Sequence, residues 1–294
     1  MIQHLLFGDV PTARVVRPFA GQLLKWIGNK QRFAHEIVAY FPQRIGTYIE
    51  PFLGSGAVLG TLVPDKALGS DCFAPLIEIW QTLRESPGTL KDWYRERWER
   101  MHAGEKTREF ERIRAAYNAR PNGADLLFLS RTCYGGVVRF RKADGHCSTP
   151  CGVHRPMPPA RFDQRVDEWR RRVQGAQFER LDFEEAMERA RYDDLVYCDP
   201  PYQHTQTILY GAQSFDLHRL FRAIEQCRRR GVRVALSIDG TKRTGTHVCR
   251  LPIPAGLFAR EVFVNCGRSM LRRFQMRDQS LENEVVHDRL LLTY

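Results

Sequence analysis

A short apolar segment that ends abruptly in two prolines constrains the fold of this chain more than any other feature. Residues 195–198 are apolar and β-prone, and Asp199-Pro200-Pro201-Tyr202 follows them directly. Each proline fixes its own φ and lacks a backbone N–H, so the strand must stop there. The Pro200 carbonyl then lies beside the Asp199 carboxylate, and two adjacent acceptors suit a planar amino group. Tyr202 adds a ring on which a planar base could stack. The alternative is a rigid turn from strand to loop.

Strands alternate with helices along the chain, which predicts an α/β sheet. We expect strands at 47–50, 66–70, 195–198, 232–238, 261–265 and 286–293. We expect helices at 29–41, 56–62, 74–85 and 217–230, and a long one over 90–118 that breaks near Gly104. Residues 121–159 mix apolar pieces with Gly, Pro and Cys, so a loop-rich insertion is expected there. Residues from about 84 to 180 would form a second lobe.

The charge of the chain points to a polyanionic partner. Lys and Arg total 45 against 34 Asp and Glu, a formal net charge of +11. A basic chain of this size is most often associated with nucleic acid. Arg272 and Arg273 lie in a run of arginines without an acid, as expected for phosphate contacts. The mean hydropathy is −0.43 and no apolar run approaches a membrane span, so no membrane association is expected.

The cysteines do not indicate disulfides or a strong metal site. Eight are scattered through a chain without an export signal, which favours reduced thiols in the cytosol. His146, Cys147, Cys151 and His154 have spacings that zinc ligands can have, but no second, separated pair accompanies them. We therefore expect no metal.

Three of the expected strands end in a carboxylate or a glycine-rich turn. Glu50 precedes Gly54-Ser55-Gly56, and Asp71 and Asp199 each follow an apolar segment. In open α/β sheets ligands bind at the carboxyl ends of the strands. An acid at the end of the second strand can accept from both ribose hydroxyls of a nucleoside. Position 59 is Leu, so the glycine pattern of dinucleotide binding is absent.

Three motifs together, in this order, resemble the DNA adenine methylase (Dam) family of N6-adenine methyltransferases. They are Lys25-Trp26-Ile27-Gly28-Asn29-Lys30, Glu50-Pro51-Phe52-Leu53-Gly54-Ser55-Gly56 and Tyr197-Cys198-Asp199-Pro200-Pro201-Tyr202. Residues 131–152 also resemble the recognition hairpin of that family. The resemblance implies a Rossmann-like methyltransferase sheet with helices on both faces, plus a smaller helical and hairpin DNA-recognition lobe. Residues 1–83 and 181–294 would form the S-adenosylmethionine-binding catalytic domain, and 84–180 the target-recognition insertion.

The resemblance also implies roles for individual residues. Asp199, Pro200 and Tyr202 would be catalytic. The cofactor S-adenosylmethionine would be bound by Trp26, Lys30, Phe52, Gly54, Ser55, Asp71, Asp182, Phe183 and Asp199, with Lys30 at its carboxylate end. Double-stranded DNA would be contacted by Lys25, Arg131, Tyr134, Arg139 and Arg141, together with Arg272 and Arg273. Asn29 and Gly135 depart from the family pattern, and the loop after Arg139 is about one residue longer.

The expected reaction is methyl transfer to the N6 atom of a flipped adenine in duplex DNA. One alternative is an N4-cytosine methyltransferase, which uses the same geometry, although Asp199 favours adenine. A second is a catalytically silent DNA-binding protein, against which Lys30, Asp71 and Asp199 argue. A third, an RNA or protein-amine methyltransferase, is disfavoured by the hairpin. We expect a cytoplasmic monomer or weak dimer of bacterial, plasmid or phage origin, with or without a cognate restriction endonuclease, acting on a GATC-like site.

Overall fold

One mixed sheet organises the protein. The computed structural model describes residues 14–201, 215–242, 247–248, 252–268 and 285–294. The strands are β1 (Tyr48–Glu50), β2 (Ala67–Asp71), β3 (Ala176–Arg180), β4 (Leu195–Cys198), β5 (Arg233–Lys242), β6 (His247–Val248), β7 (Arg260–Arg268) and β8 (Val285–Leu292). Their order is β3-β2-β1-β4-β5-β8-β7, and β6 pairs with β5 outside this path. Neighbours from β3 to β5 are parallel, whereas β8 runs antiparallel to both β5 and β7.

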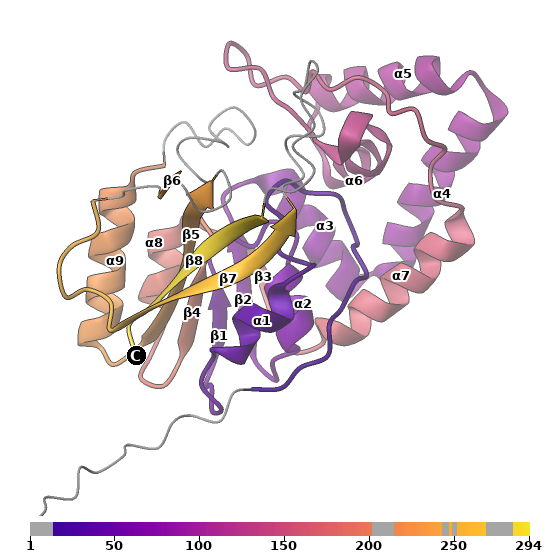
Figure 1. The fold of residues 1–294 in the computed structure, drawn as a ribbon. Coiled ribbons are helices and arrows are strands. Elements are labelled where there is room, and N and C mark those ends of the chain that lie inside the picture. The colour runs from indigo at the N-terminus through magenta and orange to yellow at the C-terminus, as the bar shows by residue number, and fades with distance from the viewer. Residues whose placement is uncertain (1–13, 202–214, 243–246, 249–251, 269–284) are drawn as a thin grey trace, which may run out of the picture.

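Helices cover both faces of the sheet. They are α1 (Ala34–Ala39), α2 (Ala57–Leu62), α3 (Ala74–Glu85), α4 (Pro87–Ala103), α5 (Lys106–Ala119), α6 (Gly123–Thr132), α7 (Pro159–Arg172), α8 (Phe183–Glu188) and α9 (Leu217–Arg229), with a 3₁₀ turn at η1 (Tyr134–Gly136). In Figure 1, α8 and α9 lie on one side of the sheet and α1, α2 and α3 on the other. The expected Rossmann-like class is thereby confirmed.

Alternation along the central strands divides the core into two layers. Successive strand residues point to opposite faces, so Tyr48 and Tyr197 pack with α1 to α3, whereas Ile49 and Val196 pack with α8 and α9. All four side chains are buried. A parallel sheet covered on both faces must be apolar on both, which is why residues 195–198 form a continuous apolar run rather than an alternating one.

The expected helix at 29–41 is shorter than predicted. α1 begins at Ala34, because the Phe33 N–H donates to the Lys30 carbonyl at 3.0 Å and closes a turn first. The expected strand end at Asp239 is also wrong. β5 continues to Lys242, with a register shift against β8 between Asp239 and Thr241.

A second lobe projects from α3 and contains α4 to α7 (Figure 1). The predicted break near Gly104 is confirmed, since α4 ends at Ala103 and α5 begins at Lys106. The loop-rich stretch at 121–159 instead opens with α6, which is buried along most of its length. A helix that is apolar on all sides has no helical periodicity in its sequence, so the pattern could not show it. The expected insertion at 84–180 also contains β3, whose pairing with β2 makes it part of the sheet.

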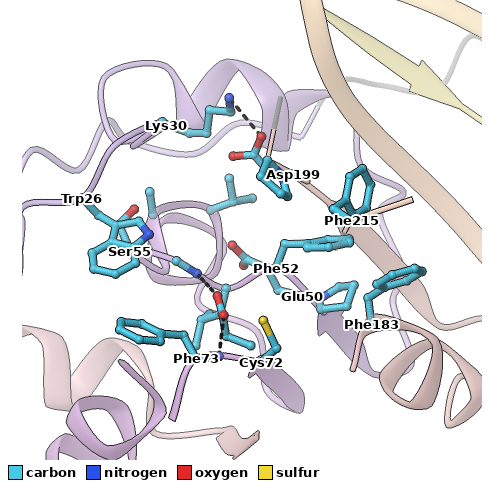
Figure 2. Close-up of a pocket in the computed structure, with 18 of the residues that line it drawn as sticks. Trp26, Lys30, Glu50, Phe52, Ser55, Cys72, Phe73, Phe183, Asp199 and Phe215 are labelled. Carbon is cyan, nitrogen blue, oxygen red and sulfur yellow. Dashed lines mark hydrogen bonds and ion pairs between the residues drawn. The ribbon is translucent and has the colours of Figure 1, made fainter. Parts of the chain in front are cut away.

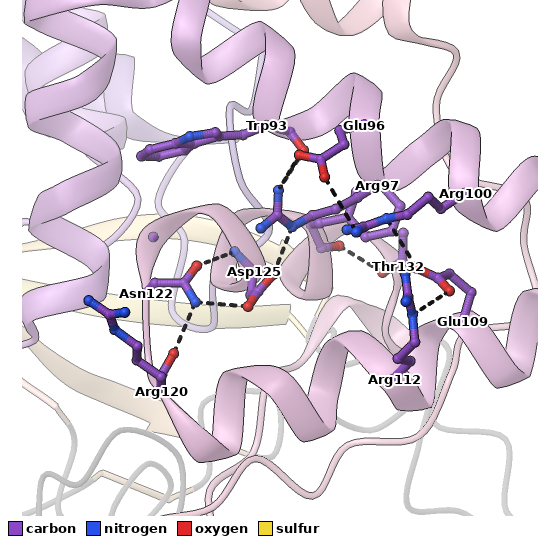
Figure 3. A network of polar contacts seen from close by, with 12 residues as sticks. Trp93, Glu96, Arg97, Arg100, Glu109, Arg112, Arg120, Asn122, Asp125 and Thr132 are labelled. Atoms are coloured by element: carbon purple, nitrogen blue, oxygen red, sulfur yellow. Dashed lines mark hydrogen bonds and ion pairs between the residues drawn. The ribbon is translucent and has the colours of Figure 1, made fainter.

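A buried ion pair joins two helices of this lobe (Figure 3). The Arg97 Nε lies 2.7 Å from the Asp125 Oδ1, and both side chains are largely buried between α4 and α6. Asn122 caps α6 by accepting from the Asp125 N–H at 2.8 Å, and its amide donates to the Asp125 Oδ2 at 2.8 Å. Asp125 therefore fixes the start of α6 and holds it against α4.

We expect Asp125→Ala to lower the free energy of unfolding by about 3–5 kcal/mol, because Arg97 loses its close carboxylate in a buried setting. Asp92→Ala is the matched control, since Asp92 pairs with Arg95 on the exposed face of α4. Its loss should be under about 1 kcal/mol. Urea unfolding followed by circular dichroism compares the two variants, and equal losses would contradict the role of Asp125.

Candidate active site

One pocket lies at the carboxyl ends of β1, β2 and β4 (Figure 2). Side chains from all three motifs singled out in the sequence line it, together with residues around the start of α8: Trp26, Lys30, Phe52, Asp71, Phe183 and Asp199. Parallel pairing of β1 with both β2 and β4 makes this convergence possible, because the three carboxyl ends share one edge of the sheet. The sequence prediction that these motifs form one site is consistent with this arrangement.

The glycine-rich turn after β1 forms one wall of the pocket. Gly54 has a φ of 47°, and a Cβ atom added there would lie 3.1 Å from the Trp26 ring. Gly56 has a φ of 60°, and its Cβ would lie 2.9 Å from the Trp80 ring. The Trp80 indole N–H donates to the Gly54 carbonyl at 3.1 Å and so fixes the turn. Side chains at either glycine would need both a rare backbone conformation and a displaced tryptophan.

Asp71 lies at the end of β2 and faces the same turn. Its carboxylate accepts from the Gly54 N–H at 3.2 Å and from the Phe73 N–H at 3.0 Å. Burial raises the pKa of Asp71, and these hydrogen bonds oppose the increase. The side chain therefore shapes the pocket wall while it lines the pocket itself.

The deepest charges of the site form a cluster around Lys30. Its ammonium lies 3.0 Å from the Asp199 Oδ1 and 3.0 Å from the Asp288 Oδ2. Burial lowers the pKa of Lys30, but the two carboxylates outweigh burial and hold the pKa well above its ordinary value. Figure 2 shows Lys30 and Asp199 pointing toward one another above the pocket. The sequence reasoning missed Asp288, although an acid at the start of the apolar run Leu290-Leu291-Leu292 was a usable signal.

Three phenylalanines gather at the other end of the pocket. Phe52 and Phe183 stack with ring centroids 5.3 Å apart and planes inclined by 25°. Phe215 presents its edge to both rings, at centroid distances of 5.7 and 5.9 Å. Phe52 and Phe183 were predicted, whereas Phe215 was missed because it lies between the motif at 197–202 and α9. The cluster gives the pocket an aromatic wall suited to a planar group.

Asp182 supports this aromatic wall as the N-cap of α8. Its side chain accepts from the Glu184 N–H at 3.0 Å, and Glu185 completes a capping box. Arg219 of α9 donates to the Asp182 Oδ1 at 3.0 Å and lies over the Phe183 ring at 5.0 Å. A direct contact of Asp182 with a cofactor stays a prediction, whereas its capping contact is part of the fold.

The remaining catalytic candidates are only partly described. Pro200 is buried next to Asp199, and Pro201 lines the pocket. Ser55 is also buried and lines it. Tyr202 lies outside the described residues, as do Arg272 and Arg273.

The residues proposed for DNA contact differ in their exposure to solvent. Lys25, Tyr134, Arg139 and Arg141 are exposed, and Arg141 pairs with Asp144. Arg131 is directed inward, where its Nη1 donates to the Leu23 carbonyl at 2.8 Å and to the Gln22 carbonyl at 3.1 Å. The structure thus gives Arg131 a structural contact where a DNA contact was expected, and the DNA contact stays a prediction.

The segment after α6 is hairpin-like, as expected. Isolated antiparallel bridges join Cys133 to Cys151 and Phe140 to Cys147. Among the residues that the structure describes, no three His, Cys, Asp or Glu side chains gather to hold a metal ion, and the group from His146 to His154 is no exception. The cysteines described in the structure are all free thiols. Within the ranges that the structure describes, none of the helices is both long enough and apolar enough to cross a membrane.

Glu50 is a buried acid on the floor of the pocket. The Tyr48 hydroxyl donates to its Oε2 at 2.8 Å, and the Leu59 N–H donates to the same atom at 3.0 Å. Burial raises the pKa of Glu50 to about 8, and the charge of Asp199 adds to the increase. The folded protein therefore retains the Glu50 proton to a higher pH than an exposed glutamate does.

This raised pKa predicts a pH-dependent stability difference. The folded protein binds the Glu50 proton more tightly than the unfolded chain does. The protonated carboxyl therefore contributes fully to the free energy of unfolding below about pH 4.5, and this contribution is lost as the pH rises toward 8. Relative to Glu50→Gln, the wild type should lose up to about 1.4 kcal/mol per pH unit in this window. Thermal unfolding of both proteins from pH 4.5 to 8 measures how their stability difference changes with pH. A constant difference would show that Glu50 ionises normally.

Comparison with known proteins places this site in a family. The sequence model of the D12 class N6 adenine-specific DNA methyltransferases matches residues 26–249. The chain is 28% identical over 250 residues to the DNA N-6-adenine-methyltransferase of Escherichia phage P1, covering 79% of this chain but 32% of that protein. It is 28% identical to the type II methyltransferase M.MjaIII of Methanocaldococcus jannaschii, covering 76% of this chain and 84% of the relative.

A DNA adenine methylase of Vibrio cholerae is 26% identical over 237 residues, covering 75% of this chain and 82% of the relative. The resemblance inferred from the three motifs is thereby confirmed. An N4-cytosine methyltransferase and a silent DNA-binding protein are not favoured. The chain belongs to the D12 class of N6 adenine-specific DNA methyltransferases.

Proposed function

We propose that this methyltransferase uses S-adenosylmethionine as its donor and methylates N6 of an adenine flipped out of duplex DNA, with Asp199 as the main acceptor for the amine. One observation carries the proposal: Asp199 lines the same pocket as Asp71, Gly54 and the aromatic cluster. An amine acceptor and a nucleoside-sized set of contacts therefore face each other across one cavity.

The residues present fit this cofactor. Phe52, Phe183 and Phe215 offer an aromatic wall for its adenine, and the Asp71 carboxylate is an acceptor for its ribose hydroxyls. Trp26, Gly54 and Ser55 line the part of the pocket where the methionine moiety would bind, close to the Lys30 cluster. When bound, the cofactor supplies a methyl group that is activated by attachment to a positively charged sulfonium, because the sulfur leaves as a neutral thioether.

The chain then has to orient a weak nucleophile. The N6 lone pair of adenine is delocalised into the ring, and hydrogen bonds from the amine to the Asp199 carboxylate and the Pro200 carbonyl favour a pyramidal nitrogen. Bound S-adenosylmethionine would supply the methyl carbon for the new N–C bond and would keep the electron pair of the broken C–S bond on its sulfur, and the amine nitrogen would lose one proton. Positioning and electrostatics account for the catalysis, because the leaving group already activates the methyl.

The adenine must leave the helix to reach Asp199. The N6 atom of a base that is stacked inside a duplex cannot enter the pocket. The enzyme therefore flips the base out, at the cost of unstacking it. Tyr202 is the proposed stacking partner and follows Pro201, which lines the pocket. The helical lobe and its hairpin would hold the flanking duplex, with Lys25, Tyr134 and Arg139 exposed for contact.

A monomer or weak dimer in the bacterial cytoplasm fits this activity, with or without a cognate endonuclease. Three of the relatives, M.MjaIII, M1.LlaDCHI and M.FokI, carry type II methyltransferase names, and others are named DNA adenine methylases. The proposed target is a short, GATC-like site.

We expect Asp199→Ala to reduce single-turnover methyl transfer by about 10² to 10³-fold, the effect of losing one transition-state contact at an oxyanion site. Binding of S-adenosylmethionine, measured by calorimetry, should be largely retained. Asp71→Asn is the complementary variant and should weaken cofactor binding, because the ribose loses an anionic acceptor. Near-normal transfer by Asp199→Ala would reject the assignment of Asp199.

Arg139 is the residue proposed to recognise a base of the target sequence. The backbone of Arg139 is held by hydrogen bonds with Thr149 and Ser148, while its side chain is exposed. A guanidinium can grip O6 and N7 of guanine, a contact worth about 1–3 kcal/mol of discrimination. Arg139→Ala should therefore relax specificity at one guanine-containing pair.

Arg272→Ala is the contrasting variant, chosen from the arginine run in the sequence. It should weaken binding to all duplexes alike and reduce the salt slope by about one unit. Methylation rates on single-base-substituted duplexes distinguish the two classes of contact. If Arg139→Ala slows every duplex by the same factor, Arg139 does not read a base.

A further inference from the structure

Lys30 is shared between two acids that come from distant parts of the chain. Lys30 precedes α1, Asp199 follows β4, and Asp288 lies on β8. The side chains of Asp199 and Asp288 are 18% and 11% exposed, and that of Lys30 is 5% exposed. With all three groups ionised, these three side chains together carry a net charge of −1, so the ammonium balances one of the two carboxylates.

In the proposed reaction, positive charge develops on the substrate amine, close to the positive charge of Lys30. Positive charge leaves the sulfonium and develops on the amine nitrogen as the new bond forms. A lysine ammonium 3.0 Å from the carboxylate that accepts from this amine opposes that development. An isolated Lys30–Asp199 pair would leave the amine facing a neutral couple rather than an anion.

We propose that Asp288 is a positioning residue that offsets the charge of Lys30, so that Asp199 faces the substrate amine with a full negative charge. The inference rests on the proposed function, because it assigns Asp199 to the amine. Asp288 acts through Lys30, and the second carboxylate also fixes the ammonium at the end of a flexible four-carbon stem.

The position of Asp288 in the sheet supports this role. Asp288 pairs in register with Val264 of β7 and with residue 239 of β5, so it lies inside the sheet rather than on a loop. Among the side chains that the structure describes, Asp199, Asp288 and Tyr197 act on Lys30, and the charge of Asp199 acts on Glu50. Asp288 is thus the second carboxylate in direct contact with the Lys30 ammonium, at 3.0 Å.

The first test compares two carboxylates of the same part of the sheet. Asp288→Asn removes the charge and keeps the size. Glu261→Gln is the matched control, because Glu261 pairs with Arg289, the next residue on β8, at 2.7 Å and does not line the pocket. With saturating S-adenosylmethionine and DNA, Asp288→Asn should lower the single-turnover methylation rate on the order of 10- to 100-fold, as loss of a supporting partner does at other sites. Glu261→Gln should retain the wild-type rate.

Further variants separate charge balance from a purely structural effect. Asp288→Glu keeps the charge and should restore most of the rate. Lys30→Met is measured alone and in combination with Asp288→Asn. The combination returns the three side chains to a net charge of −1, so the double variant should be no slower than Asp288→Asn alone at saturating cofactor. Strong non-additivity of this kind is the signature of two groups that act on one another.

The outcomes are distinguishable. A wild-type rate for Asp288→Asn overturns the inference, and so does a double variant that shows the product of the two single losses. A loss of thermal stability in Asp288→Asn without a change in rate also overturns it. If Asp288→Asn does not fold, the Asp288→Glu and double variants carry the comparison. A wild-type protein that transfers no methyl group to adenine in DNA defeats the proposed function itself, separately from these results.

Discussion

The parallel pairing of β1 with β2 and β4 is the constraint on which the rest of the structure depends. Each of these strands ends in a different piece of chemistry: a glycine-rich turn, the Asp71 carboxylate and the Asp199-Pro200-Pro201 motif. Only a parallel arrangement brings all three ends to one edge of a sheet. The apolar layers on both faces hold these strands in register, so the pocket depends on the packing of the whole α/β core.

Around this edge, the site is divided into a charged end and an aromatic end. Lys30, Asp199 and Asp288 form the first, and Phe52, Phe183 and Phe215 form the second. The separation has a chemical logic, because an aromatic wall binds a flat, weakly polar ring whereas buried charges act on a developing charge. The glycine turn packs against Trp26 and is fixed by Trp80, and it forms one wall of the pocket.

The helical lobe is held to the catalytic core by contacts that carry little sequence signal. Arg131 on α6 binds the backbone carbonyls of Gln22 and Leu23, just before the motif that begins at Lys25. Gly136 lies close to Lys25, since a Cβ added to it would be 3.2 Å from the Lys25 Cβ. The segment that contributes Trp26 and Lys30 to the pocket is thus also attached to the lobe.

The sequence by itself determined the α/β class, the motifs and most residues of the pocket. Such features are local: apolar runs, prolines that end a strand, and glycines at tight turns leave their mark within a few residues. The tertiary structure alone decided what depends on distant partners. The Lys30–Asp288 pair joins residues at opposite ends of the chain, α6 is buried along most of its length, and β3 is defined by its pairing with β2. Hydrogen-bond register and ion pairing are set by packing across the whole sheet, and no short window of sequence records them.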